Sequence, residues 1–191
     1  MRSRALTLAL PALAGLLLAC GSGAAAGLST DPAAPAVAVG ERLEISLVSE
    51  EPLRGEPEWE LLELHGGGLL SSRGRTVTYV APPAAGTYHL IARGARVDGS
   101  PARLIQAVQV MPQARIEPAS ASLRPGATLV FSARIKGLPR GTVTWKVEDS
   151  DSGAITPEGV YTAPGRTGTF RVVATSTEDA SVLLTATVTV N

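Results

Sequence analysis

Tyr79–Ala92 reads YVAPPAAGTYHLIA, and Tyr161–Ala174 reads YTAPGRTGTFRVVA. Both stretches contain a tyrosine, then Ala-Pro, then Gly-Thr followed by an aromatic residue, with the same spacing and 82 positions apart. Trp59 and Trp145 extend the correspondence, because each lies 19 positions after a glycine in its own half of the chain. Such self-similarity indicates a domain that is present twice.

Hydrophobic and polar residues alternate in both halves. Leu43, Ile45 and Leu47 share one face of LEISL, and LVFSARI, VTWKV and TATVTV alternate in the same way. A period of two marks half-buried antiparallel strands, and turns rich in Gly and Pro separate them. The sequence therefore predicts an all-β chain with two tandem antiparallel sandwiches, at 37–111 and 112–191. The tryptophan-to-tyrosine interval is 20 residues in the first half and 16 in the second, so the first domain carries four additional residues there.

A signal peptide is expected at residues 1–19. Arg2 and Arg4 precede fifteen uncharged residues, ALTLALPALAGLLLA, which are fewer than the roughly 20 that a membrane-spanning helix needs. A basic start, an apolar run and a small residue at the end are typical of a secretory signal.

Cys20, the only cysteine of the chain, follows directly. LLAC at Leu17–Cys20 resembles the lipobox of bacterial lipoproteins. In that family the cysteine receives a diacylglycerol, the signal is cut before it, and the new amino terminus is acylated. The resemblance implies a lipid attachment at Cys20, with palmitate, in the cell envelope, and Gly21 implies the outer membrane of a Gram-negative bacterium. The alternative is an ordinary signal peptide with a chance cysteine at the cut.

Residues 20–36 are expected to form a lipidated flexible linker, because small residues, Gly and Pro leave almost no apolar bulk to bury. Without Arg2 and Arg4, 15 basic and 17 acidic side chains remain, a formal charge of −2. Such a balance gives no long-range attraction for nucleic acid, so no nucleic-acid partner is expected.

The strand sequences carry a family resemblance. After Trp145 the second half reads GVYTAP, GTFRVVATS and ATVTV, and the first half has related stretches. This pattern resembles the immunoglobulin sandwich and, more closely, the group-2 type of bacterial immunoglobulin-like domains. The resemblance implies that apolar residues replace the core cysteines and that Tyr88 donates a corner hydrogen bond that Phe170 cannot. The implied replacements are Leu90 and Val172 on one strand, and Ile45 and Phe131 on another.

Catalytic and stacking sites find little support in the sequence. Six of the seven aromatic residues fall at paired positions of the repeat, and Phe131 aligns with Ile45 on an inward face. No ring is therefore expected to be free for stacking, which argues against carbohydrate binding and against binding of single-stranded nucleic acid. His65 has no second His or Cys nearby for zinc, and His89 is expected to be a surface side chain. No nucleophile, base and orienting group form a recognisable set, so the chain is not expected to be an enzyme or to hold a cofactor.

Two loops are candidate binding sites. Asp149 and Asp151 in EDSDSG resemble the first half of a calcium loop, although the same residue types also form ordinary turns. Leu69 and Leu70 in HGGGLLSSRGR are candidates for an apolar binding loop, with a short strand as the alternative.

The function expected from these features is that of a lipid-anchored envelope protein, held to the membrane through its N-terminal lipid. Its Ig-like domains would act as a non-catalytic binding, adhesion or spacer module with a protein partner in the envelope or at the surface. The alternative is an accessory subunit that docks on an envelope complex or a secreted enzyme.

Overall fold

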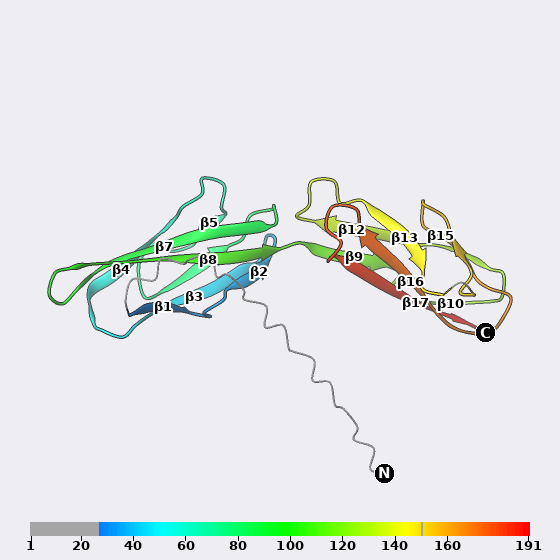
Figure 1. The fold of residues 1–191 in the computed structure, drawn as a ribbon, viewed down its shortest axis with the longest axis horizontal. Coiled ribbons are helices and arrows are strands. Elements are labelled where there is room, and N and C mark those ends of the chain that lie inside the picture. The colour runs from blue at the N-terminus through cyan, green and yellow to red at the C-terminus, as the bar shows by residue number, and fades with distance from the viewer. Residues whose placement is uncertain (1–26, 150) are drawn as a thin grey trace, which may run out of the picture.

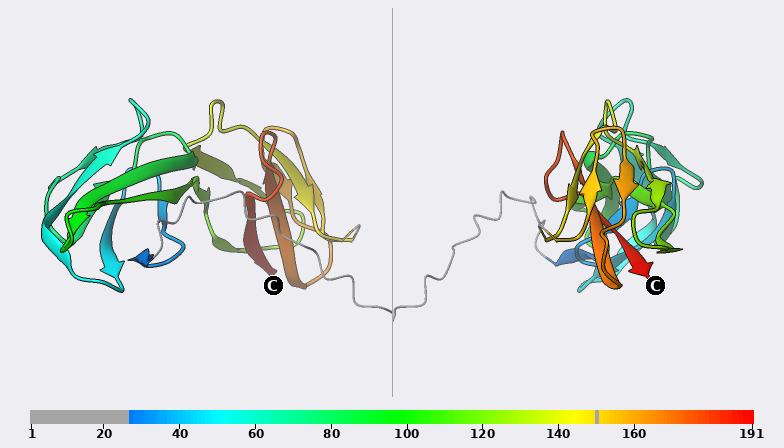
Figure 2. Two further views of the ribbon diagram at one scale, coloured as in Figure 1. Left: turned by 60° about the vertical axis from the view of Figure 1, so that its left-hand side comes forward. Right: turned by 90° about the vertical axis from the view of Figure 1, so that its right-hand side faces the viewer.

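The structure is a computed structural model that describes residues 27–149 and 151–191. Over these residues the chain is all-β, and it forms two sandwiches that lie end to end (Figure 1). The view turned by 60° shows the same arrangement, with one sandwich following the other (Figure 2, left). None of the described residues belongs to a helix long and apolar enough to cross a membrane.

The first sandwich has two four-stranded sheets. Their orders are β1-β3-β6-β5 and β2-β8-β7-β4, and β2 with β8 is the parallel pair. The strands are β1 (Leu28–Asp31), β2 (Ala36–Ala38), β3 (Arg42–Ser49), β4 (Leu53–Leu61), β5 (Gly68–Leu69), β6 (Thr76–Val80), β7 (Gly86–Arg96) and β8 (Pro101–Met111).

The second sandwich repeats this arrangement. The order β10-β17-β16-β13 matches β2-β8-β7-β4, again with one parallel pair, while β9-β12 and β11-β15-β14 together match the other sheet. The strands are β9 (Gln113–Glu117), β10 (Ser120–Leu123), β11 (Thr128–Val130), β12 (Ser132–Lys136), β13 (Val143–Val147), β14 (Ala154–Ile155), β15 (Val160–Thr162), β16 (Gly168–Ser176) and β17 (Leu183–Val190). This strand order is that of an Ig-like sandwich, so the predicted fold class is confirmed.

Each sandwich has its own core, built from the alternating residues of the strands. The four residues expected at the positions of core cysteines are all buried: Ile45, Leu90, Phe131 and Val172. The first core also contains Trp59 and Val108, and the second contains Ala186 and Val188. Burying a Val, Leu, Ile or Phe side chain of this kind stabilises the fold by about 1.5–3 kcal/mol.

The first domain begins earlier than the sequence predicts. The expected linker over 20–36 is wrong from Leu28 onward, because β1 pairs antiparallel with the end of β3. Leu28 and Thr30 are buried, and the Thr30 hydroxyl donates to the Pro32 carbonyl. A four-residue strand with a single apolar residue, Leu28, gives too weak an alternation to be recognised.

The two sandwiches touch at their junction. β8 ends at Met111 and β9 begins at Gln113, so only one residue separates them. The Ala85 N–H donates to the Gly137 carbonyl across the junction, with N and O 2.8 Å apart. Gly137 has φ +95°, and a Cβ there would lie 2.7 Å from the Val39 side chain. The contact therefore requires glycine at this position.

The repeated tyrosine makes the same buried hydrogen bond in both domains. The Tyr79 hydroxyl donates to the Gly66 carbonyl, and the Tyr161 hydroxyl donates to the Ser152 carbonyl, each over 2.6 Å. Burial raises the pKa of Tyr79 to about 12 and also raises that of Tyr161. Each bond ties a loop that follows β4 or β13 to the strand that carries the tyrosine.

The glycine beside each acceptor is equally constrained. Gly67 and Gly153 have φ +104° and +90°, and a Cβ at either position would lie 2.2 Å from a carbonyl oxygen of the tyrosine strand. The proline of the repeated motif, Pro82 or Pro164, lies against the same glycine. The Tyr-x-Ala-Pro motif is thus one half of a packed loop-to-strand contact whose other half is a Gly-containing loop.

The expected corner hydrogen bond of Tyr88 is also present. Its hydroxyl donates to the Ala84 carbonyl over 3.1 Å, at an exposed position. Phe170 stands at the equivalent place in the second domain, and the Arg166 guanidinium carbon lies 4.8 Å from its ring centroid.

We predict that Tyr79→Phe and Tyr161→Phe each destabilise their own sandwich by about 1–3 kcal/mol, because a buried carbonyl loses its donor. Urea unfolding followed by tryptophan fluorescence measures this, since each domain carries one tryptophan. Tyr88→Phe is the matched control, because the second domain naturally has phenylalanine there. Equal effects of Tyr79→Phe and Tyr88→Phe would contradict the assignment.

Candidate functional site

The loops held by the tyrosines form two equivalent corners. We call residues 62–67 the first corner and residues 148–153 the second corner. Each begins directly after β4 or β13 and ends before β5 or β14. Because the Gly66 and Ser152 carbonyls accept equivalent bonds, the backbone of the two corners is anchored alike. What the corners present to solvent depends on the residues between these anchors.

The first corner presents apolar side chains. Leu62 is 54% exposed and Leu64 is 92% exposed, and Leu70 shortly after the corner is 61% exposed. Single exposed apolar residues are normal on a protein surface, but three exposed leucines fall within nine residues here and make this part of the first domain apolar.

Glu63 anchors the first corner to the neighbouring strand. Its Oε1 lies 2.7 Å from the His89 Nδ1, and its Oε2 accepts the His89 backbone N–H over 2.8 Å. Burial acts to raise the pKa of Glu63, but the hydrogen bonds from His89 outweigh it and hold the pKa below the ordinary value of 4.5. His89, expected at the surface, is about one third exposed and serves this anchor.

The second corner presents acidic side chains instead. Glu148 pairs with Arg171 over 3.4 Å, and Asp149 and Asp151 are exposed. Ser152 is fully buried, and its Oγ has no hydrogen-bond partner among the described residues. The two corners thus share the tyrosine hydrogen bond and differ in their exposed side chains, which are mainly apolar in the first corner and acidic in the second.

The calcium hypothesis for Asp149 and Asp151 stays a prediction. Both lie on the second corner, which also contains a residue outside the described ranges. Within 27–149 and 151–191, no group of three or more His, Cys, Asp and Glu side chains is placed to hold a metal ion.

Leu69 and Leu70 have different environments. Leu69 lies in β5, pairs with Tyr79 of β6 and packs against the first core. β14 is the counterpart of β5 in the second domain. The alternative prediction of a short strand is therefore correct for Leu69. Leu70 alone remains exposed. Leu62 and Leu64, the exposed leucines of the first corner, were not predicted. They follow β4 directly, so in the sequence they look like a continuation of its alternating strand pattern.

The remaining predicted positions are placed as follows. His65 is exposed on the first corner, while Trp59, Tyr79, Phe131, Tyr161 and Phe170 are buried in the two cores. Trp145 and Tyr88 are partly buried and pack against the cores. Cys20 lies outside the described residues.

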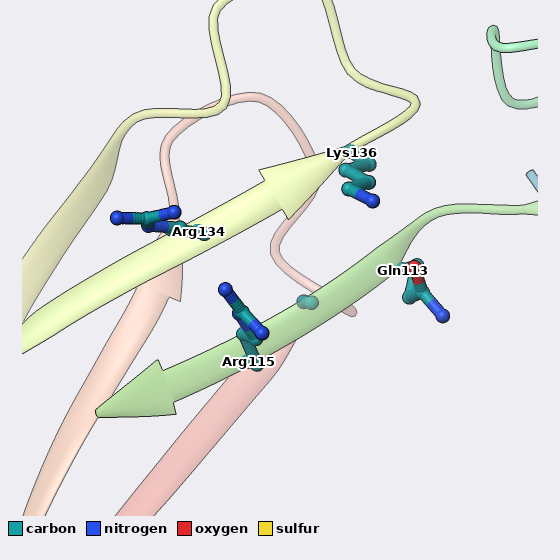
Figure 3. Close-up of a pocket in the computed structure, with 5 residues that line it drawn as sticks. Gln113, Arg115, Arg134 and Lys136 are labelled. Carbon is teal, nitrogen blue, oxygen red and sulfur yellow. The ribbon is translucent and has the colours of Figure 1, made fainter. Parts of the chain in front are cut away.

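A basic cleft on the second sandwich was not expected from the sequence. Arg115 of β9 stands directly opposite Arg134 of β12, and Lys136 follows on the same face (Figure 3). The cleft has a volume of about 410 Å³ and is lined by these residues with Gln113 and Ala114. Like charges directly opposite on neighbouring strands are destabilising, and Glu117, 3.4 Å from Arg115, offsets part of this repulsion. Only the pairing register of β9 and β12 brings Arg115 and Arg134 together, so their positions in the sequence do not predict the cleft.

Comparison with protein-family models and with curated proteins finds no match for the chain. Among solved structures it is similar to the insect immune protein hemolin, at 15% identity and a TM-score of 0.43, over 83% of this chain and 45% of that one. It is also similar to a C-terminal fragment of intimin in complex with the translocated intimin receptor's intimin-binding domain, at 15% identity and a TM-score of 0.42, over 86% and 63%. Fibronectin(III)-like modules of Clostridium thermocellum CbhA match at 17% identity and a TM-score of 0.33, over 86% and 94%.

The chain thus spans less than half of the hemolin chain and less than two thirds of the intimin fragment. The assignment of the Ig-like sandwiches rests on the strand order and pairing of the chain itself.

We predict that Glu63 contributes stability that depends on pH. Its pKa is lower in the folded than in the unfolded chain, so the contribution is present above the unfolded value and is lost as pH falls through the folded value. Glu63→Gln should therefore lower the melting temperature at neutral pH and flatten its fall between about pH 5 and 3. The exposed Glu44→Gln is the control, and the same pH profile for both variants would refute the anchor.

Proposed function

We propose that the protein is a lipid-anchored, non-catalytic binding module of the bacterial cell envelope. The anchor is Cys20, whose LLAC context resembles a lipobox. Residues 20–27 connect it to the first sandwich, which begins at β1. The domains are of the group-2 bacterial type that the Tyr-x-Ala-Pro motif resembles, and the membrane is the outer membrane of a Gram-negative cell.

The observation that supports binding is the contrast between the corners. Identical tyrosine bonds hold both backbones, yet the first corner exposes leucines where the second exposes carboxylates. The tyrosine bonds anchor both corners equally well, so the stability of the fold does not require different exposed side chains at the two corners. A protein that acts only as a spacer has no use for this difference. Loops held on a rigid β-scaffold are common binding elements, and exposed leucines fit an apolar protein surface. The partner of the first corner is therefore a protein.

We predict that Cys20→Ser abolishes palmitate labelling and releases the chain from the membrane fraction. The physical reason is that stable anchoring takes more than one acyl chain, and without the thiol neither the diacylglycerol nor the subsequent amine acylation is added. Ser22→Ala is the matched control beside it. Persistent membrane association of Cys20→Ser would show that the lipid anchor is wrong.

We predict that the double substitution Leu62→Ser and Leu64→Ser removes the cross-links that the full chain forms to a protein partner in intact cells. Val97→Ser is the control, because Val97 is 69% exposed on the turn between β7 and β8, away from the corner. Melting curves of both variants check that the fold is kept.

One stoichiometric partner lost in the leucine variant favours an accessory subunit of an envelope complex. Several surface partners lost in it favour adhesion. Cross-links that persist unchanged in the leucine variant rule out the first corner as the binding site.

A further inference from the structure

The outer edge of β4 in the first sandwich is covered by the chain itself. The Trp59 N–H donates to the Ser72 carbonyl, and the Gly74 N–H donates to the Pro57 carbonyl, over 2.8 and 3.0 Å. The Trp59 indole N–H also donates to the Gly74 carbonyl over 2.9 Å, and Arg73 pairs with Glu58. The segment after β5 therefore shields this edge and buries the tryptophan.

Within residues 27–149 and 151–191, no segment hydrogen-bonds to the equivalent edge of β13. Thr177 N–H donates to the Thr142 carbonyl and Glu148 N–H to the Arg171 carbonyl, so the even-numbered residues bond to β16. The N–H and C=O groups of Val143, Trp145 and Val147 consequently point away from β16. Across the part of the chain that the structure describes, β13 pairs with β16 alone, and no hydrogen bond reaches the Trp145 indole.

The difference has a simple origin in chain length. Gly67 and Tyr79 are 12 positions apart, whereas Gly153 and Tyr161 are only 8 apart. The four residues that the second copy lacks are those that would cover its edge. Trp59 is accordingly 3% exposed, while Trp145 is only partly buried. A strand of β-branched and aromatic residues with free backbone groups is a template for another strand.

We propose that β13 pairs with β13 of a second copy of this chain, antiparallel and about a two-fold axis at Trp145. This register places Trp145 opposite its own copy and Val143 opposite Val147 of the second chain. Their outward N–H and C=O groups then form the ladder, because opposed residues of this parity exchange both hydrogen bonds. The half-exposed side chains on the inner face also cover one another across the new pair.

The charges along β13 favour this self-pairing. Arg140 lies before the strand, while Glu148, Asp149 and Asp151 lie at and after its end. Among the described residues, the Arg140 side chain and both aspartates have no ion pair. An antiparallel pair brings the basic end of each copy to the acidic end of the other, whereas a parallel pair would oppose like charges. Lys146 then faces Thr144, so no like charges stand directly opposite.

Disulfide trapping tests this register in the purified full chain. Thr144 and Lys146 of the second copy form a non-hydrogen-bonded pair, with Cα atoms about 4.5 Å apart, which suits a disulfide. On mild oxidation, a mixture of Thr144→Cys and Lys146→Cys chains should give a disulfide-linked heterodimer. Either variant alone should give much less, and the unmodified chain reports any contribution of Cys20. Absence of the heterodimer, or equal yields in all mixtures, would overturn the proposal.

Val143→Pro tests the interface by copying the first domain, which has Pro57 at the equivalent position. The Val143 N–H points outward, so proline removes one dimer hydrogen bond from each chain and none of the bonds to β16. Dimer affinity, measured by light scattering against concentration, should fall about tenfold, while Val143→Thr should leave it nearly unchanged. A chain that is monomeric at every concentration, or a dimer indifferent to Val143→Pro, contradicts the proposal. If Val143→Pro fails to fold, the trapping experiment decides.

Discussion

The buried hydrogen bond from the tyrosine hydroxyl to a loop carbonyl is the interaction on which both sandwiches depend. Tyr79 and Tyr161 are the largest fully buried side chains, and each has one polar atom that must find a partner there. The acceptor lies in the loop after β4 or β13, and the neighbouring glycine packs against the tyrosine strand. Tyrosine, glycine and proline therefore recur together because they form one contact.

With this contact in place, the two copies are free to differ elsewhere. The cores keep the same pattern of buried strands, while the corners exchange leucine for carboxylate. The strand edges differ in the same way. In the first copy four additional residues shield β4, and in the second copy none of the described residues covers the outer edge of β13. The two domains thus have cores of the same pattern and different surfaces.

The sandwiches could be predicted from the sequence because burial follows the alternation of apolar and polar residues along the strands. Ile45 and Val188, for example, are buried at apolar positions of this pattern. It did not predict β1, whose four residues are too few to show a pattern. The repeated Tyr-x-Ala-Pro motif does not by itself reveal the tyrosine hydrogen bonds, because their acceptors lie 13 and 9 residues away in loops.

The surface features were harder to predict for a related reason. Arg115 and Arg134 meet only through the register of β9 and β12, and the covered edge of β4 depends on backbone groups of Ser72 and Gly74. Such features arise from pairing between distant segments, so composition and spacing do not reveal them. Leu69 and Leu70 are a further example. Pairing of β5 with β6 turns Leu69 toward the core and leaves Leu70 exposed, and this pairing cannot be read from two adjacent leucines in the sequence.

Ionisation of the buried tyrosines tests the shared contact most directly. In a Tyr88→Phe chain, Tyr79 and Tyr161 are the only phenols, and near-ultraviolet absorbance reports their phenolates. We expect no phenolate near the ordinary pKa of about 10 while the protein is folded, with Tyr79 ionising at about 12, and ordinary titration of both tyrosines after unfolding. Ionisation of either tyrosine near pH 10 in the folded chain would contradict the buried hydrogen bond.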